Sequence, residues 1–140
     1  MRRRTELLAW VAAVSWLAGA ACGGNAATTD DYYAQDKRRN VWYFGEFESA
    51  FTRDKHGKII KVSHEGSWEA GVRGAEPGYI MPAHPHVGDH YFQEHAPGVA
   101  LDSAKVIRTG VTLNVDSKVY RDVVLTREFT RLEPTVTDFK

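Results

Sequence analysis

The chain has little cysteine, no excess of charge of either sign and, beyond residue 21, no long apolar run. Its single cysteine, Cys22, excludes an intramolecular disulfide, so a folded domain must be held together by its core. The 18 basic and 18 acidic residues give no net charge at pH 7. A nucleic-acid-binding protein needs a clearly basic face, so we expect no nucleic-acid partner.

The one apolar run lies at the N-terminus. Met1 is followed by three arginines, and residues 7–21 are apolar apart from Ser15 and end in small residues. The run is shorter than the roughly 20 residues that a membrane-spanning helix needs, and its layout is typical of a secretory signal peptide. We therefore predict a signal peptide over residues 1–21 and an exported protein of the cell envelope.

Cys22 follows the apolar run directly, where bacterial lipoproteins carry their diacylglycerol. Residues 22–30 would then be a flexible tether to the membrane. A lipoprotein usually has Leu three residues before this cysteine, whereas this chain has Gly19. Two outcomes stay open: lipidation at Cys22, which we favour, or cleavage near Ala20 or Ala21 and a soluble periplasmic or extracellular product.

Strand and turn signals dominate the rest of the chain. Residues 41–44 are aromatic and β-branched, residues 54–58 have the composition of a hairpin loop, and residues 59–63 return as a strand. Recurring Gly and Pro between residues 66 and 98 leave no room for a helix of ordinary length. We predict a single β domain over residues 31–140, with no sizeable helix apart from the signal peptide.

The C-terminal half predicts more strands. Residues 89–95 fit one strand, and residues 106–115 and 119–132 fit a hairpin that turns at residues 116–118. In the last strand, Val119, Val123, Leu125 and Phe129 share one parity, while Thr126 falls on the opposite, more polar one. A period of two favours a half-buried antiparallel strand.

A series of motifs in the mature chain is similar to those of a known family. The motifs are Tyr32–Asp36, Val41–Glu46, Glu65–Gly71, Pro77–Ala83, Gly88–Asp89 with Gln93–Glu94, and Pro97–Gly98. In this order they resemble a family of uncharacterised exported bacterial proteins, some of them lipoproteins. The resemblance covers roughly residues 31–134 and implies an all-β, strongly curved antiparallel sheet, a partial barrel-like meander. It implies no activity, because the family has no established reaction or ligand.

Two departures from this family bear on stability and assembly. Its members usually have more β-structure before the segment at Tyr33 and another strand after residues 138–140. The chain thus looks like a shortened member whose single domain is incomplete and whose sheet edges are exposed. Exposed edges invite pairing with another chain, so we expect a homo-oligomer or low stability.

Four of the six histidines fall within residues 84–95. If the chain is extended there, His84, His86 and His90 share one side of it, with Glu94 further along, and such ligands suit Zn²⁺ or Cu²⁺. The extended span from His84 to His90 is about 20 Å, so a single metal ion requires the loop to fold back. The resemblance gives these histidines no support. We favour surface histidines in a loop and an edge strand, with a metal site as the alternative.

Other chemical signals are weaker. Glu65, Glu69, Asp89 and Glu94 can supply a carboxylate pair for glycoside hydrolysis only at a defined separation. The sequence has no nucleophile elbow and no phosphate-binding glycine loop. Seven aromatic residues fit either a ligand cleft or, as we favour, the core of a small β domain: Trp42, Tyr43, Phe44, Trp68, Tyr79, Tyr91 and Phe92.

Taken together, these signals favour a non-enzymatic binding or structural module of the cell envelope. Its ligand would be apolar or amphipathic, bound without a cofactor. One alternative is a histidine-based Zn²⁺- or Cu²⁺-binding protein or metalloenzyme. A second alternative is a truncated copy without independent function.

Overall fold

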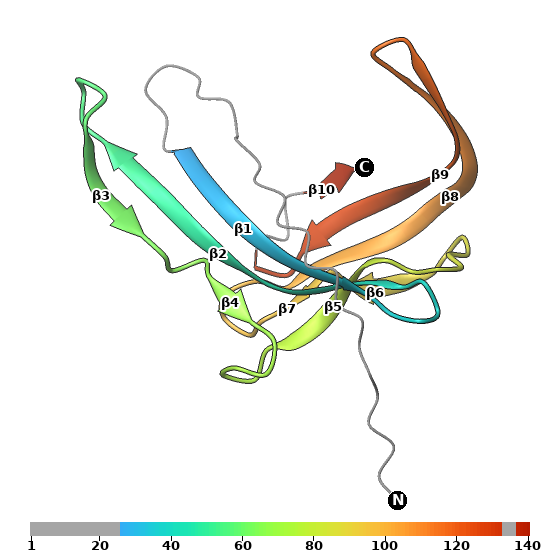
Figure 1. Ribbon diagram of the computed structural model, residues 1–140, viewed down its shortest axis with the longest axis horizontal. Helices are drawn as coiled ribbons and strands as arrows, with labels where there is room; N and C mark the ends of the chain where they lie inside the picture. Colours follow the sequence, from blue (N-terminus) through green and yellow to red (C-terminus); the bar gives the residue numbers. More distant parts are fainter. Residues whose placement is uncertain (1–25, 133–136) are drawn as a thin grey trace, which may run out of the picture.

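The computed structural model describes residues 26–132 and 137–140 of the chain. These residues form ten strands in two antiparallel sheets (Figure 1). The strands are β1 (Ala26–Gln35), β2 (Val41–Arg53), β3 (Ile59–Ser63), β4 (Trp68–Glu69), β5 (Glu76–Met81), β6 (His90–Phe92), β7 (Glu94–His95), β8 (Asp102–Val115), β9 (Lys118–Thr130) and β10 (Thr137–Phe139).

The all-β, antiparallel class predicted from the sequence is confirmed for the described residues, which contain no helix. Accordingly, none of them belongs to a helix long and apolar enough to cross a membrane. The prediction was one curved sheet, whereas the strands form two. The strands divide between a sheet of order β1-β2-β5-β7, with β3 and β4 also paired to β2, and a sheet of order β10-β9-β8-β6. Neither strand order closes on itself.

Strand β2 organises the first sheet. One edge of β2 pairs with β1 along nearly its whole length, and the other pairs in turn with β5, β4 and β3. The register between β1 and β2 shifts opposite Gly45, which has a φ of 139°. A Cβ at Gly45 would lie only 2.2 Å from the backbone oxygen of Trp68, so a side chain there would prevent β4 from approaching.

Strand β1 begins inside the segment that we expected to be a flexible tether. Residues 26–30 pair with residues 47–51 of β2. These residues form a strand because β2 is long enough to pair with them. Their small and polar side chains suit a half-exposed position. Any tether is therefore limited to residues before Ala26, which lie outside the described part of the chain.

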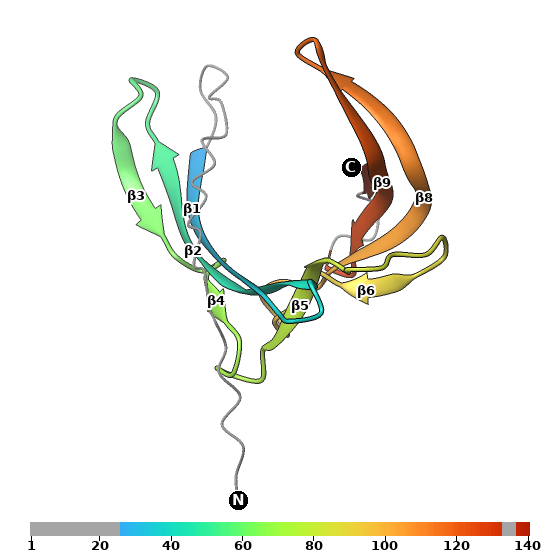
Figure 2. The same cartoon turned by 45° about the vertical axis from the view of Figure 1, so that its right-hand side comes forward.

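The second sheet is built on the long β8–β9 hairpin. A two-residue turn joins its strands, with φ of 47° at Asp116 and 65° at Ser117, as the predicted hairpin requires. The register shifts three times along the hairpin, near Gly110 and opposite Asp122, both with positive φ. Such irregularities bend and twist a strand pair. Figure 2 shows the result: the hairpin curves upward on one side of the molecule, and β1, β2 and β3 rise on the other.

The predicted strand over residues 89–95 is divided between the two sheets. Strand β6 pairs with β8, whereas β7 pairs with β5, and Gln93 alone separates them. The Gln93 backbone N–H donates to Asp102 O at 2.8 Å, and its side chain donates to Glu128 Oε1 at 2.9 Å. Gln93 is thus a corner at which the chain passes from one sheet to the other, a common device where sheets meet at an angle.

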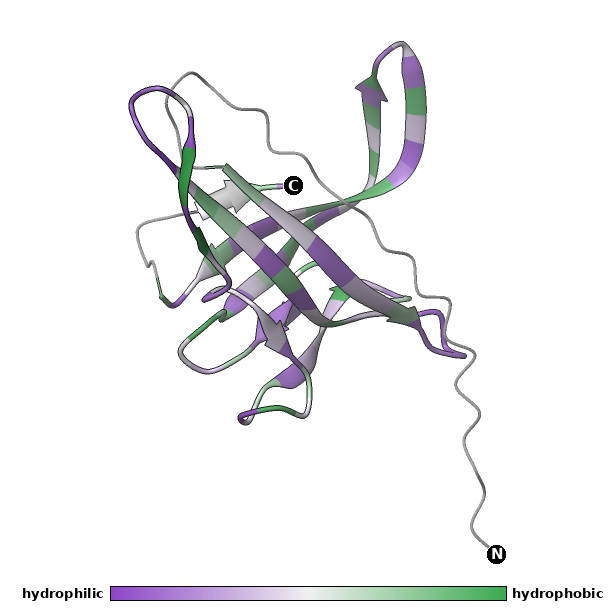
Figure 3. Cartoon of the chain, turned by 60° about the vertical axis from the view of Figure 1, so that its left-hand side comes forward, coloured by the Kyte–Doolittle hydropathy of each residue, from purple (hydrophilic) through white to green (hydrophobic). Residues whose placement is uncertain are grey.

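The core lies near this corner and is small. Its buried members are Tyr43, Trp68, Ala75, Ala96 and Ala100, and a second buried group contains Ser103, Ala104, Val106 and Thr126. The distal parts of the strands carry many exposed apolar side chains. Figure 3 shows hydrophobic and hydrophilic residues alternating along the β8–β9 hairpin.

Candidate functional site

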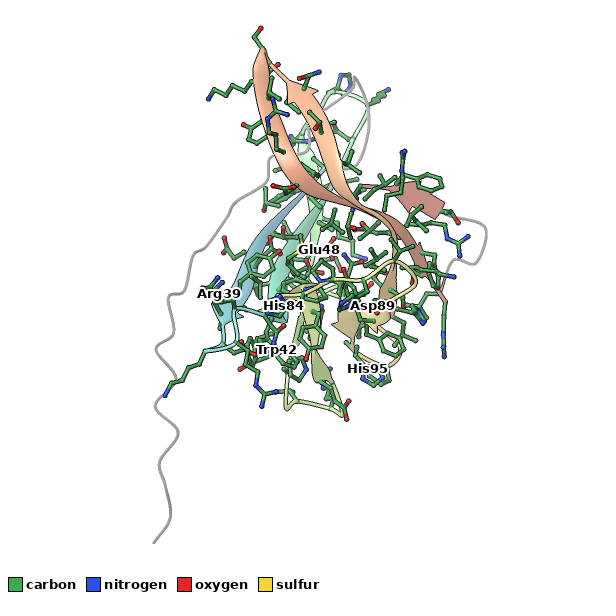
Figure 4. The ribbon with its side chains drawn as sticks, turned by 90° about the vertical axis from the view of Figure 1, so that its right-hand side faces the viewer. Arg39, Trp42, Glu48, His84, Asp89 and His95 are labelled. Carbon is green, nitrogen blue, oxygen red and sulfur yellow. The ribbon has the colours of Figure 1, made fainter. Side chains whose placement is uncertain are left out.

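The histidine-rich segment runs between the two sheets. Near its start, Ala83 N–H donates to Asn40 Oδ1, in the β1–β2 turn, at 2.9 Å. Near its end, Gly88 N–H donates to Val106 O, in β8, at 2.9 Å. The two ends of the loop are thus held by different parts of the fold, the β1–β2 turn and strand β8. In the view of Figure 4, His84 lies on the same side of the molecule as Trp42, and Asp89 and His95 lie on the other side.

The other histidines have separate partners. His86 faces Asp89 at 3.6 Å, and Asp89 also accepts the His86 backbone N–H at 2.7 Å. His90 stacks on Phe129, with ring centroids 5.5 Å apart. Among the residues that the structure describes, no group of three or more His, Cys, Asp or Glu is placed to hold a metal ion. The geometry gives no support to a Zn²⁺ or Cu²⁺ site at His84, His86 and His90.

Two glycines in and just after this segment, Gly88 and Gly98, occupy turns. Gly88 and Gly98 have φ of 99° and 79°, which glycine adopts readily. Gly98 lies in the turn where Ala96 O accepts the backbone N–H of both Val99 and Ala100. The turns at Gly88 and Gly98 thus flank β6 and β7.

A group of carboxyl side chains lies where the two sheets meet. Asp31 of β1 pairs in register with Glu46 of β2, and Asp31 is 6% exposed. The Tyr43 hydroxyl donates to Asp31 Oδ1 at 2.7 Å and lies 3.3 Å from Glu46 Oε2. Burial, followed by this bond to Asp31, raises the pKa of Tyr43, so the phenol remains a neutral donor.

The opposite side of the acidic group comes from β7 and β8. Burial is the main cause that raises the pKa of Glu46 to about 7; the bond from Tyr43 lowers this pKa, and repulsion by Asp31, Glu48 and Asp102 contributes to its rise. Burial likewise raises the pKa of Glu94 to about 8, with added repulsion from Glu46 and Asp102. We name Asp31, Glu46, Glu94 and Asp102 the carboxylate cluster. The ion pairs formed by side chains in the described part of the chain involve other residues.

Trp68 contacts both the core and this cluster. Its ring packs edge-on against Tyr43, with centroids 5.3 Å apart, and Tyr43 stacks on Tyr33 at 4.8 Å. Trp68 is 7% exposed, and its indole N–H has no hydrogen-bond acceptor of good geometry. The N–H nevertheless lies near enough to Glu94 to favour the charged form of that carboxyl and to lower its pKa.

A pocket of about 340 Å³ opens beside Trp68 and Glu46. This volume is within the range of small-molecule sites, roughly 300–1,000 Å³. Strands β1, β2 and β4 and the turns after β4 and β7 supply its walls. Its lining is mainly apolar and aromatic: Tyr32, Phe47, Trp68, Val72, Ala75, Ala96, Pro97 and Val99, with the polar residues Glu46, Ser67, Glu69 and Arg73.

The predicted cleft aromatics mostly lie elsewhere. Of the seven, only Trp68 lines the pocket. Tyr43 is buried in the core, as the preferred interpretation expects, whereas the half-buried Trp42 packs on Tyr79 outside it, with ring centroids 3.9 Å apart. Of the four candidate glycosidase carboxylates, Glu69 lines the pocket and Glu94 belongs to the carboxylate cluster, so the structure does not unite the four in one site.

Sequence reasoning missed Glu46 as a site residue. The available signal was its place directly after Gly45 in an otherwise aromatic strand, where a carboxyl group must be partly buried. Asp31 follows the polar residues Thr28, Thr29 and Asp30, so the sequence gives no signal that it is buried. Only the pairing of β1 with β2 and the approach of β7 and β8 bring these side chains together.

The comparisons with known proteins add no function. No protein-family model, no curated protein and no solved structure matches this chain. The resemblance to an exported bacterial family therefore stays a prediction. The predicted signal peptide and Cys22 lie outside the described residues.

Proposed function

We propose that this protein is an exported, non-enzymatic binding module that holds a small amphipathic molecule in the pocket beside Trp68. The observation that carries the proposal is the pocket itself, whose lining is mainly apolar and includes a few polar residues. Small-molecule sites typically combine these two features. The apolar part of the ligand would pack against Phe47, Val72 and Val99, and its polar group would face Glu46.

Amide nuclear magnetic resonance of the mature chain, residues 22–140, tests ligand binding. This chain has only two tryptophans, Trp42 and Trp68. The Trp42 indole N–H is already bonded to Asp36 at 3.0 Å, whereas that of Trp68 has no acceptor of good geometry. On titration with 1-octanol, we expect the Trp68 indole signal to shift and that of Trp42 to stay in place.

A pair of tryptophan substitutions identifies the binding location. Val72→Trp places a bulky ring in the pocket wall, and Val87→Trp places the same ring at an exposed position outside it. We expect Val72→Trp to weaken octanol binding at least tenfold and Val87→Trp to leave it unchanged. Equal binding by both variants, or no binding by the parent protein, would reject the proposed function.

We also propose that the module is tethered to the cell envelope by a lipid on Cys22, as the N-terminal sequence predicts. In a bacterial host, the wild-type protein should fractionate with membranes, and Cys22→Ser should release it into the soluble fraction. A wild-type protein found only in the soluble fraction would instead support cleavage near Ala20 or Ala21.

A further inference from the structure

We infer that the pocket selects amphiphiles whose polar group is a cation, with an alkylammonium ion as the simplest member of the class. The inference rests on the proposed function and specifies the ligand. Three independent features of the pocket carry it: the charges in its lining, the carboxylates behind its wall and its aromatic side chains.

The lining carries more acid than base. Glu46 and Glu69 contribute carboxyl groups, and Arg73 contributes the only guanidinium among the lining residues. Arg73 is exposed, in the turn after β4, whereas Glu46 is partly buried against the core. In the inferred complex, the ammonium group of a bound ligand forms a charge-assisted hydrogen bond with the partly buried carboxyl of Glu46.

The carboxylate cluster extends this negative charge behind the wall. Glu46 faces Tyr43 and Glu48 on its own strand, Asp31 on β1, Glu94 on β7 and Asp102 on β8. None of these neighbours is a cation. A bound positive charge beside Glu46 would offset the mutual repulsion of these carboxylates, whereas a bound anion would increase it.

The aromatic residues favour the same ligand class. Tyr32, Phe47 and Trp68 line the pocket together. The faces of aromatic rings attract cations, and groups of such rings recognise quaternary ammonium ligands in other proteins. Aromatic walls and carboxyl groups in one pocket thus suit a ligand with both an apolar chain and a positive head.

Three ligands with the same chain separate the contributions of head and tail. Isothermal titration at pH 8.5 would compare octyltrimethylammonium, 1-octanol and octanoate with the mature protein. We expect the cation to bind at least tenfold more tightly than the alcohol, and octanoate to bind least. Octanol binding without a preference for the cation, or a preference for octanoate, would overturn the inference but leave the proposed function intact. No binding of any of them would reject both.

Isosteric variants identify the carboxyl that recognises the cation. Glu46→Gln should remove most of the preference for octyltrimethylammonium over 1-octanol, and the exposed Glu69→Gln should reduce this preference less. Glu65→Gln, at an exposed position outside the pocket, is the matched control. An unchanged preference in Glu46→Gln would contradict the inference.

The pH dependence gives a second readout that a purely structural role for Glu46 would not produce. The trimethylammonium charge is constant, so any change in affinity reports on the protein. Because the pKa of Glu46 is about 7, affinity for the cation should fall several-fold between pH 8.5 and pH 6. The dependence should be clearly weaker in Glu46→Gln, where Glu94 still titrates in this range, and a dependence as steep as that of the wild type would contradict the assignment.

Discussion

Glu46 and Glu94 hold their protons more tightly in the folded protein than in the unfolded chain. Burial raises their pKa values from 4.5 to about 7 and about 8. The folded state therefore binds more protons than the unfolded state between about pH 4.5 and pH 8. Stability contributed by these two groups is fully present below pH 4.5 and is lost as the pH rises through their folded pKa values.

We expect the melting temperature of the mature protein to be higher at pH 5.5 than at pH 8.5, by at least about 4 °C. Glu94→Gln, which imitates the protonated acid, should melt at a higher temperature than the wild type at pH 8.5 and should flatten the pH profile. Circular dichroism melts in matched buffers measure both effects. A wild-type protein that is more stable at pH 8.5 would contradict the assignment, and Glu65→Gln serves as the neutral control.

A comparison of Gly45 with Gly57 separates the cost of a positive φ from the cost of a steric clash. Both have positive φ, but only at Gly45 would a Cβ clash with neighbouring backbone, whereas Gly57 has open space around it. We expect Gly57→Ala to cost about 1 kcal/mol and Gly45→Ala at least about 3 kcal/mol. Urea unfolding measures both values, and equal losses would show that the approach of Trp68 to Gly45 is unimportant.

At the residue scale, the sequence predicts turns better than sites. Asp54–Lys58 and Asp116–Ser117 are identifiable because turn residues act locally, through their own φ and side-chain bonds. The histidines were the obvious chemical signal, but their loop is fixed at Asn40 and Val106, which is a tertiary effect. Glu46 is identifiable as a site residue only from the tertiary structure, in which β7 and β8 lie beside it.

At the scale of elements, the β8–β9 hairpin carries a tight turn with non-ideal residues. Two-residue turns with positive φ at both positions prefer Asn-Gly, whereas this chain has Asp116-Ser117. We expect Asp116→Asn with Ser117→Gly to stabilise the protein by about 1 kcal/mol, or roughly 4 °C in melting temperature. Ser117→Pro fixes φ near −65° and should destabilise it. A melting temperature that rises in the first variant and falls in the second supports the turn geometry. Shifts in the same direction would exclude it.

The alternation predicted for the last strand is only partly right. Thr126 has the parity opposite to that of the apolar residues, yet it is only 8% exposed, whereas the hydrophobic Val119 is exposed. The cause is the irregular pairing around Asp122, which has a φ of 57°. Such an irregularity changes which side of the sheet the following residues face, and parity counted from sequence does not detect it.

Strand β3 is an edge strand with apolar side chains exposed on both faces. Ile59, Ile60 and Val62 are all more than 40% exposed, and among the described strands β3 pairs only with β2. Such an edge favours pairing with a second copy. We expect the mature protein to self-associate and Ile60→Lys to shift it toward monomer in analytical ultracentrifugation. Lys61→Ile should strengthen association, and a monomeric wild-type protein at high concentration would contradict this expectation.

For the whole molecule, composition and periodicity were enough to predict an all-β fold without helices. They did not predict two sheets, because the division depends on the corner at Gln93 within a segment that looks like one strand. The small core also follows from this arrangement. Much of β3 and of the distal β8–β9 hairpin extends beyond the core, which leaves their apolar residues exposed.

The passage through Gln93 also limits how the length of this protein can vary. Loss of one residue there would either pull β6 from β8 or invert the sides on which Glu94 and His95 lie. The loop at residues 54–58 and the tip at residues 116–117 have no such constraint. Among natural or engineered variants of this chain, insertions and deletions should therefore accumulate at those two tips and be excluded between β6 and β7.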